Sequence, residues 1–363
     1  MKLFYEMVVE SPVTDLSHEL RDLGDQIVER CGGVPLSIVV TVELLILERK
    51  HLGDLGFLRV LCVECKELPL SLPDEIGNLS QLSYLRLWAF GLRKLPSMMS
   101  NLKTLLTLDA EECYNLLFDD VIWKMKQLRH IIFPRVRVSE SASHILLFRD
   151  KITRCKANMH RFCSFETCLP NPQTLLHMHG FNLKFHWLRK FTNLRKLGIN
   201  FSTERIFEVL SGANPAAYKL EYLQLFWLIN FFETTKLNLF HYQNLFKLKL
   251  SGGIKQFPGL DKLPTNLTKL TLVQSELKED AIEILKKLPK LKVLKLGSWS
   301  YKEREIVCFG AENFPHLEVL KLQYLYKLEK LLVEEGGMPK LNKLQIHRCE
   351  PLREISDWLK NKM

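Results

Sequence analysis

The sequence predicts an α/β fold: a solenoid of stacked repeats, with a curved parallel sheet and irregular return segments, preceded by a short helical segment. Three observations predict it. A Leu-x-x-Leu-x-Leu pattern recurs along most of the 363 residues. The first 50 residues lack this pattern and show helix-type spacing instead. The composition, 47% apolar and 25% charged, is that of a globular chain able to bury a core.

The Leu-x-x-Leu-x-Leu pattern returns at steps of 22–26 residues, apart from one gap of 66 residues between Leu128 and Leu194. It starts at Leu58, Leu82, Leu105, Leu128, Leu194, Leu220, Leu245, Leu267, Leu291, Leu317 and Leu341. Each unit predicts one short strand whose alternating leucines point inward, plus a return segment that closes the coil. Because no unit buries its apolar face alone, neighbouring units stack. The pattern and its period indicate a leucine-rich-repeat array.

The repeats set the domain boundaries. We predict a helical segment over residues 1–50 and a repeat domain over 51–363, with about 12–13 repeats. One degenerate repeat begins at Leu175 as "LLHMHG", and residues 138–170 form an irregular repeat or an inserted loop. Cys113 and Cys349 occupy the Asn/Cys position of their repeats, so we interpret both as structural.

Two helices are predicted before the repeats. Residues 15–31 place Leu16, Leu20, Leu23 and Ile27 on one helical stripe, and a glycine pair follows. Pro35 then opens a second helix, "PLSIVVTVELLIL", which is apolar nearly all round and needs burial against another element.

Charge and cysteine content bound the cellular setting. The net charge is +10, yet the first 50 residues carry 5 basic and 9 acidic side chains, which indicates a partner or docking surface. No secretory signal or membrane-spanning segment is visible, and nine cysteines show no disulfide framework. We therefore expect a cytoplasmic protein without a transmembrane segment.

Two stretches suggest chemistry that the rest of the sequence does not support. "NLLFDDVIWKM", residues 115–125, is similar to a nucleotide-binding strand end, but the chain has no Gly-Lys-Ser/Thr phosphate loop, so Asp119 and Asp120 are interpreted as loop residues.

A second stretch holds potential zinc ligands whose gaps match no standard finger: Cys155, His160, Cys163, Cys168, His177 and His179. We predict no bound metal, no catalytic residues and no enzyme activity.

A family resemblance follows from two features together. The segment "IVERCGGVPLSIVV" resembles the Gly-Leu-Pro-Leu segment of the plant NB-ARC nucleotide-binding module, matching at Cys31, Gly32, Gly33, Pro35 and Leu36, with Val34 in place of leucine. With the repeats that follow, including "LPDEIGNLSQLSYLRL", the chain resembles plant NLR disease-resistance proteins of the coiled-coil class, the late-blight-resistance-like group. The resemblance implies that residues 1–50 are an NB-ARC remnant, that the module acts in innate immunity, and that Pro35 would lie beside bound ADP. Since the phosphate loop and the Met-His-Asp motif are absent, we expect no cofactor.

The outward positions of the strands predict a partner surface on the concave face. The candidate residues are Arg195, Lys196, Lys247, Lys249, Lys269, Lys292, Lys295, Lys321 and Lys343. One interpretation is a solvated lysine face; the other is an electropositive groove for an acidic protein, such as a pathogen effector, a guarded host protein or the NB-ARC module of another NLR. The alternative function is a basic solenoid that binds nucleic acid or a phosphate ligand. Because the lysines are not interleaved with aromatics, protein is favoured and no nucleic acid is expected.

Overall fold

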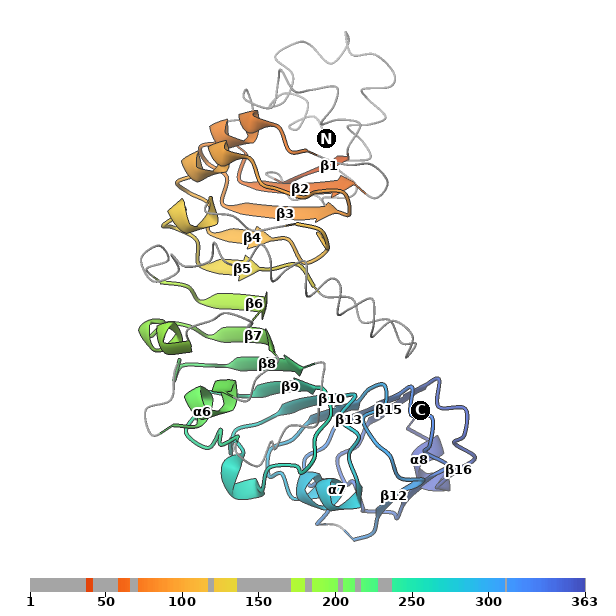
Figure 1. The fold of residues 1–363 in the computed structure, drawn as a ribbon. Helices are drawn as coiled ribbons and strands as arrows, with labels where there is room; N and C mark the ends of the chain where they lie inside the picture. The colour runs from red at the N-terminus through yellow and green to blue at the C-terminus, as the bar shows by residue number, and fades with distance from the viewer. Residues whose placement is uncertain are drawn as a thin grey trace, which may run out of the picture. The chain divides into compact units, whose positions relative to one another are not determined.

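The computed structural model describes residues 37–41, 58–65, 71–116, 121–135, 171–179, 185–201, 205–212, 217–227, 237–310 and 312–362 (Figure 1). The chain divides into two compact units, residues 1–177 and 178–363. Each unit is built from parallel strands and short return segments, as the repeat pattern predicts.

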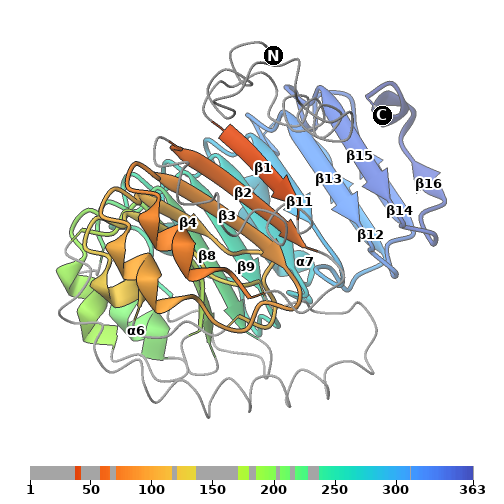
Figure 2. The same ribbon diagram turned by 90° about the horizontal axis from the view of Figure 1, so that it is seen from above.

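Unit 1 contains five strands and the start of a sixth. They are β1 (Ser37–Thr41), β2 (Val60–Cys65), β3 (Tyr84–Ala89), β4 (Thr107–Asp109), β5 (His130–Ile132) and β6 (Thr174–His179). Each pairs in parallel with the next, and Figure 2 shows β1, β2 and β3 pointing the same way. The return segments form single turns of 3-10 helix: η3 (Asp74–Asn78), η4 (Ser97–Asn101) and η5 (Ile122–Lys124).

Prolines set the start of the first two return turns. Pro73 and Pro96 immediately precede η3 and η4, both with extended backbone. A proline has no N–H to leave unpaired, so it suits the entry to a helical turn. Ile76 and Met99 then point inward and are fully buried. The return segments therefore close the core from the side opposite the strands.

Unit 2 contains the longer repeats. Its main sheet runs β7 (Lys196–Phe201), β8 (Tyr222–Trp227), β9 (Lys247–Ser251), β10 (Lys269–Val273), β11 (Val293–Leu296), β13 (Val319–Gln323) and β15 (Lys343–His347), all parallel. A second, three-stranded parallel sheet joins β12 (Glu305–Cys308), β14 (Lys330–Val333) and β16 (Glu354–Ile355). The other elements are η7 (Phe185–Lys190), α6 (Arg205–Ser211), η9 (Leu260–Lys262), α7 (Glu279–Lys286) and α8 (Asp357–Lys360).

The leucine pattern explains the core of unit 2. In β10, Leu270 and Leu272 are 1% and 0% exposed, while their neighbours Lys269 and Thr271 are more accessible. Leu270, Leu294 and Leu320 lie side by side in the strand register and are all buried, which confirms the predicted alternation. In Figure 1, the main sheet of this unit curves, with α7 and β12 on its outer side.

The C-terminal segment covers the last strand of the main sheet. The backbone N–H of Leu344 in β15 donates to the carbonyl of Lys362, 2.7 Å away, and Leu359 of α8 is fully buried. An uncovered edge strand offers unpaired N–H and C=O groups to other chains. This return of the chain therefore covers part of the edge of β15.

Two local expectations are wrong. Residues 37–41 of the helix predicted from Pro35 form strand β1, which pairs with β2. The segment Ile38–Thr41 is entirely β-branched, and a short apolar run does not distinguish a strand from a helix by periodicity alone. Leu175 does not open its repeat: it pairs with Ile131, the second apolar position of the preceding unit. The buried Pro172 precedes it by three residues, at the position where the pattern has its first leucine.

Several expectations lie outside the described residues. They are the helix over residues 15–31, Pro35, the irregular stretch 138–170, and the aspartates Asp119 and Asp120. The described parts of "NLLFDDVIWKM", residues 115–116 and 121–125, fall between β4 and β5 with Ile122 and Met125 buried, as a return segment requires. Within the described ranges, no helix is long and apolar enough to cross a membrane.

Candidate protein-interaction face

Unit 2 presents a regular outward surface, here called the strand face, which consists of the outward-pointing positions of its main sheet. Its first row is Lys196, Tyr222, Lys247, Lys269, Val293, Val319 and Lys343. Its second row is Gly198, Gln224, Lys249, Thr271, Lys295, Lys321 and Gln345. The two rows hold seven lysines and no aspartate or glutamate. The repeat register therefore gathers positive charge that is scattered in the sequence.

The lysines of the strand face lie close enough to affect one another. Partial burial, together with the charges of Lys269 and Lys196, lowers the pKa of Lys247. Burial and the adjacent charge of Lys321 likewise lower the pKa of Lys295. Like charges held together favour a ligand of opposite charge, because such a ligand removes their mutual repulsion.

Most of these lysines make no internal ion pair. Within the described part of the chain, no carboxylate lies within ion-pair distance of Lys269, Lys295, Lys321 or Lys343. Lys247 instead places its Nζ 4.4 Å from the centroid of the Tyr222 ring, a cation–π contact. The Tyr222 hydroxyl donates to Gln224 Oε1 at 2.7 Å, which holds the ring on the strand face.

Two predicted site residues lie elsewhere. Arg195 and Lys292 each stand one position before a strand rather than within the two rows. Arg195 Nη1 lies 2.9 Å from Glu221 Oε1, and Lys292 Nζ lies 2.8 Å from Glu318 Oε1. Each pair joins adjacent repeats at the edge of the sheet. The structure therefore brings together seven of the nine predicted cations and places these two in ion pairs between repeats.

Unit 1 has a different strand surface, on which charges pair with one another. Asp109 is nearly buried, 3.8 Å from Arg86 Nε and 3.5 Å from the Tyr84 hydroxyl, and desolvation raises its pKa. Glu111 accepts hydrogen bonds from Arg135 and from His177, whose Nε2 is 3.2 Å away, and these lower its pKa to about 2. The named charges of this surface therefore pair with one another, unlike the lysines of the strand face in unit 2.

The cysteines interpreted as structural lie in the turns of their repeats. Cys113 is fully buried, with Sγ 3.2 Å from the carbonyl of Leu87, and burial raises its pKa to about 12. Cys349 is 7% exposed, with Sγ 3.6 Å from the carbonyl of His347. Thiols of raised pKa are poor nucleophiles. Among the described residues, no group of three His, Cys, Asp or Glu side chains is arranged to hold a metal ion.

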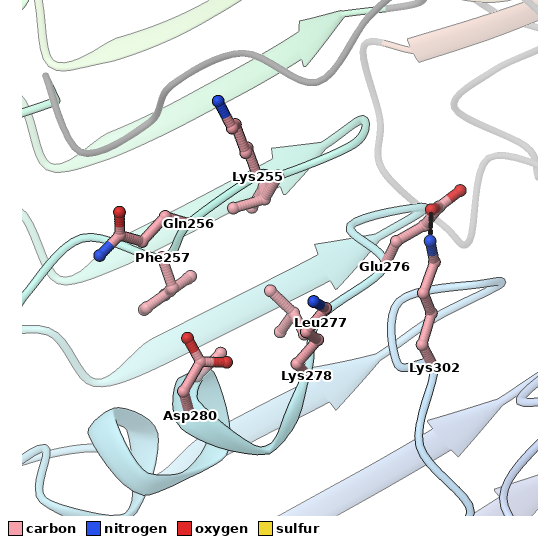
Figure 3. Close-up of a pocket in the computed structure, with 10 residues that line it drawn as sticks. Lys255, Gln256, Phe257, Glu276, Leu277, Lys278, Asp280 and Lys302 are labelled. Atoms are coloured by element: carbon pink, nitrogen blue, oxygen red, sulfur yellow. Dashed lines mark ion pairs between the residues drawn. The ribbon is translucent and has the colours of Figure 1, made fainter.

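A cavity of about 350 Å³ lies among the return segments that follow β9, β10 and β11 (Figure 3). Side chains of both charges line it: the lysines Lys255, Lys278 and Lys302, and the carboxylates Glu276 and Asp280. Lys302 and Glu276 pair with each other. With three lysines against two carboxylates, the cavity has a net charge of only +1, whereas the strand face has seven lysines and no carboxylate.

Sequence reasoning missed an aromatic and cationic group at the ends of β11, β13 and β15. Trp299 is 46% exposed, and its ring centroid lies 5.1 Å from that of Tyr326. Trp299, Tyr324 and Arg348 follow successive strands at steps of 25 and 24 residues. That spacing equals the repeat period, so extending the ladder past the strand leucines would have found the group.

Comparisons with known proteins agree with this architecture. A family model described as "Leucine-rich repeat region" matches residues 173–361, more than half of the chain. The chain is 31% identical over 296 residues to the "Probable disease resistance RPP8-like protein 4" of Arabidopsis thaliana, covering 80% of this chain and 30% of that protein. It is 29% identical over 282 residues to the "ToMV susceptible protein tm-2" of Solanum lycopersicum, covering 76% and 31%.

Among solved structures, a leucine-rich-repeat protein of Leptospira interrogans is similar with a TM-score of 0.43 and 17% identity, covering 89% of this chain and 85% of that one. The chain thus spans about a third of the length of the curated plant relatives it matches. Those relatives are described as disease resistance or virus susceptibility proteins. The chain belongs to the leucine-rich repeat family, and over this region it is similar to plant disease resistance proteins.

Proposed function

We propose that the chain is a protein-interaction module of plant innate immunity, which uses the strand face of unit 2 to bind an acidic protein surface. The observation that carries the proposal is the composition of the two rows, with seven lysines and no carboxylate. A surface that only needed solubility would do as well with both signs of charge interspersed. The similarity to disease resistance proteins supplies the biological setting.

The partner classes follow from this charge. A pathogen effector, a guarded host protein or the nucleotide-binding module of another resistance protein would each fit if it presented a negative surface. The module acts by binding, without a catalytic step, in the cytoplasm, and needs no cofactor. Electrostatic complementarity of this kind mainly raises the association rate and fixes the partner's orientation. Binding should therefore weaken steeply as salt rises.

The test compares two double variants with the same change in net charge. Lys295→Gln with Lys321→Gln removes two positive charges from the second row of the strand face. The control, Lys278→Gln with Lys287→Gln, removes two exposed lysines that flank α7. Proteins from extract of infected leaves, with and without nuclease treatment, are captured on the wild type and on both variants, over a series of salt concentrations.

We expect the strand-face variant to lose partners that the wild type and the control retain. Equal capture by all three proteins would mean that the lysines only solvate the sheet, and the proposal would be wrong. Capture that disappears on nuclease treatment would instead favour the nucleic-acid alternative, whose affinity falls with salt through counterion release.

A further inference from the structure

The ends of β11, β13 and β15 carry a cluster of aromatic and cationic side chains, here called the terminal patch: Trp299, Tyr324, Tyr326, His347 and Arg348. The ring centroids of Tyr324 and Tyr326 are 6.4 Å apart, and those of Tyr324 and His347 are 5.3 Å apart. The Arg348 guanidinium lies 5.5 Å from the Tyr324 ring. Trp299 and Tyr326 are 46% and 39% exposed, so a large apolar surface faces solvent.

The backbone of the terminal patch is unfavourable for the side chains it carries. Trp299, Tyr324 and Arg348 have φ angles of 54°, 56° and 50°, in the left-handed region. Glycine adopts this conformation readily, whereas bulky side chains do so rarely. The equivalent turns bring the chain out of each strand, and folding alone would favour glycine there. Large aromatic and cationic residues at these turns therefore indicate a role other than stability.

Positive charge lies beside the aromatic surface. Lys295 and Lys321 are register partners on the strand face and make no ion pair within the described residues. Lys321 precedes Tyr324 by three residues. At the rise of a β-strand, this spacing is about 10 Å, a span that a short extended peptide covers. Arg348 adds a third cation, 5.5 Å from the centroid of the Tyr324 ring.

We propose that the terminal patch, together with Lys295 and Lys321, is the recognition centre for an extended acidic segment of a partner protein. A large apolar or aromatic side chain of that segment packs among Trp299, Tyr324 and Tyr326. Its carboxylates pair with Lys295, Lys321 and Arg348. Trp, Tyr and Arg are the residues that most often dominate binding energy at protein interfaces. The inference rests on the proposed function, since it locates where the strand face holds its acidic partner.

The experiment selects short random peptides, displayed on phage, against the immobilised full chain. We expect enriched peptides to combine several acidic residues with one aromatic residue. Synthetic copies are then titrated by fluorescence anisotropy. Trp299→Gly should weaken binding on the order of 30-fold, as loss of an interface hot spot does. Tyr326→Ala, outside the left-handed turn positions, provides a second test in case Trp299→Gly fails to fold.

Two controls separate binding from folding. Gln274 has a φ angle of 52° and lies in the left-handed turn directly after β10. Gln274→Gly therefore changes the same kind of turn position but removes no residue of the terminal patch. Phe309→Ala removes an exposed aromatic residue, 54% accessible, that follows β12 in the second sheet. Both controls should bind the selected peptides like the wild type.

Three results would overturn the inference: no enrichment, enriched peptides without acidic and aromatic residues, or equal binding by the wild type and the patch variants. The variant Lys247→Gln with Lys269→Gln distinguishes this failure from failure of the proposed function. If it loses acidic peptides that the patch variants retain, the strand face binds acidic partners elsewhere and only the terminal patch is wrong. If no acidic peptide binds any protein, both proposals fail.

Discussion

Replacing Leu294 by alanine tests the repeat register and its energetic basis together. The Leu294 side chain is 1% exposed and lies in register between Leu270 and Leu320, which are 1% and 2% exposed. Both neighbours are fixed by their own strands, so the cavity left by the substitution cannot collapse readily. Leu294→Ala should therefore lower the free energy of unfolding by about 3–5 kcal/mol, the upper part of the usual range for such a substitution. Lys295→Gln, one residue later, should change stability by less than about 0.5 kcal/mol.

Urea unfolding of both variants, followed by far-UV circular dichroism, measures the two free energies. In a solenoid each repeat contacts its neighbours, so Leu294→Ala should also broaden the transition if the repeats on either side unfold separately. The reasoning would be refuted if Lys295→Gln destabilised as much as Leu294→Ala. That result would mean a register shifted by one residue, which exchanges the two faces of every strand.

Three further expectations follow from local contacts. Gly252 has φ +133°, and an added Cβ would lie 2.5 Å from the carbonyl oxygen of Trp227. Gly252→Ala should therefore lower the free energy of unfolding, measured by thermal unfolding, by about 2–4 kcal/mol. Gly310→Ala, with φ +88° but nothing within 4 Å of the added Cβ, should lower it by only about 1–2 kcal/mol. The pKa of Glu111 falls from 4.5 to about 2 on folding, so its contribution to stability is complete above pH 4.5 and is lost as pH falls toward about 2. Acid titration should therefore destabilise the wild type more than Glu111→Gln over that window; equal acid sensitivity would contradict the assignment. Cys113, with its pKa raised to about 12, should resist iodoacetamide at neutral pH until the chain unfolds, as peptide mass spectrometry can show.

Much of the fold was predictable because the leucine pattern and the strand geometry share one cause. Each buried leucine in the main-sheet strands of unit 2, such as Leu248 or Leu270, is both a pattern position and a core position. The pattern could not distinguish helix from strand at Ser37–Thr41, since a run of apolar residues has no period. It also misplaced Leu175, because Pro172 stands where the pattern expects a leucine.

The candidate site was predictable only in part. Lys249, Lys295 and Lys321 were named because they alternate with leucines, and the structure aligns Lys295 with Lys321 on one row. Arg195 and Lys292 were named for the same reason, but their ion pairs depend on which glutamate stands in the next repeat. The left-handed turns at Trp299 and Tyr324 are set by backbone geometry after the strand, which residue periodicity does not report.

The strand rows also bear on how such a chain can change over generations. Each row takes one residue from each repeat, and the inward leucines that stabilise the array are separate from it. Recombination that gains or loses one whole repeat would keep every leucine in its place and displace one part of the surface relative to the next by one strand spacing, about 4.8 Å. A point mutation at a row position would alter the surface at that one position only. The residues that determine what the surface binds can therefore vary between generations while the leucines that maintain the fold stay the same.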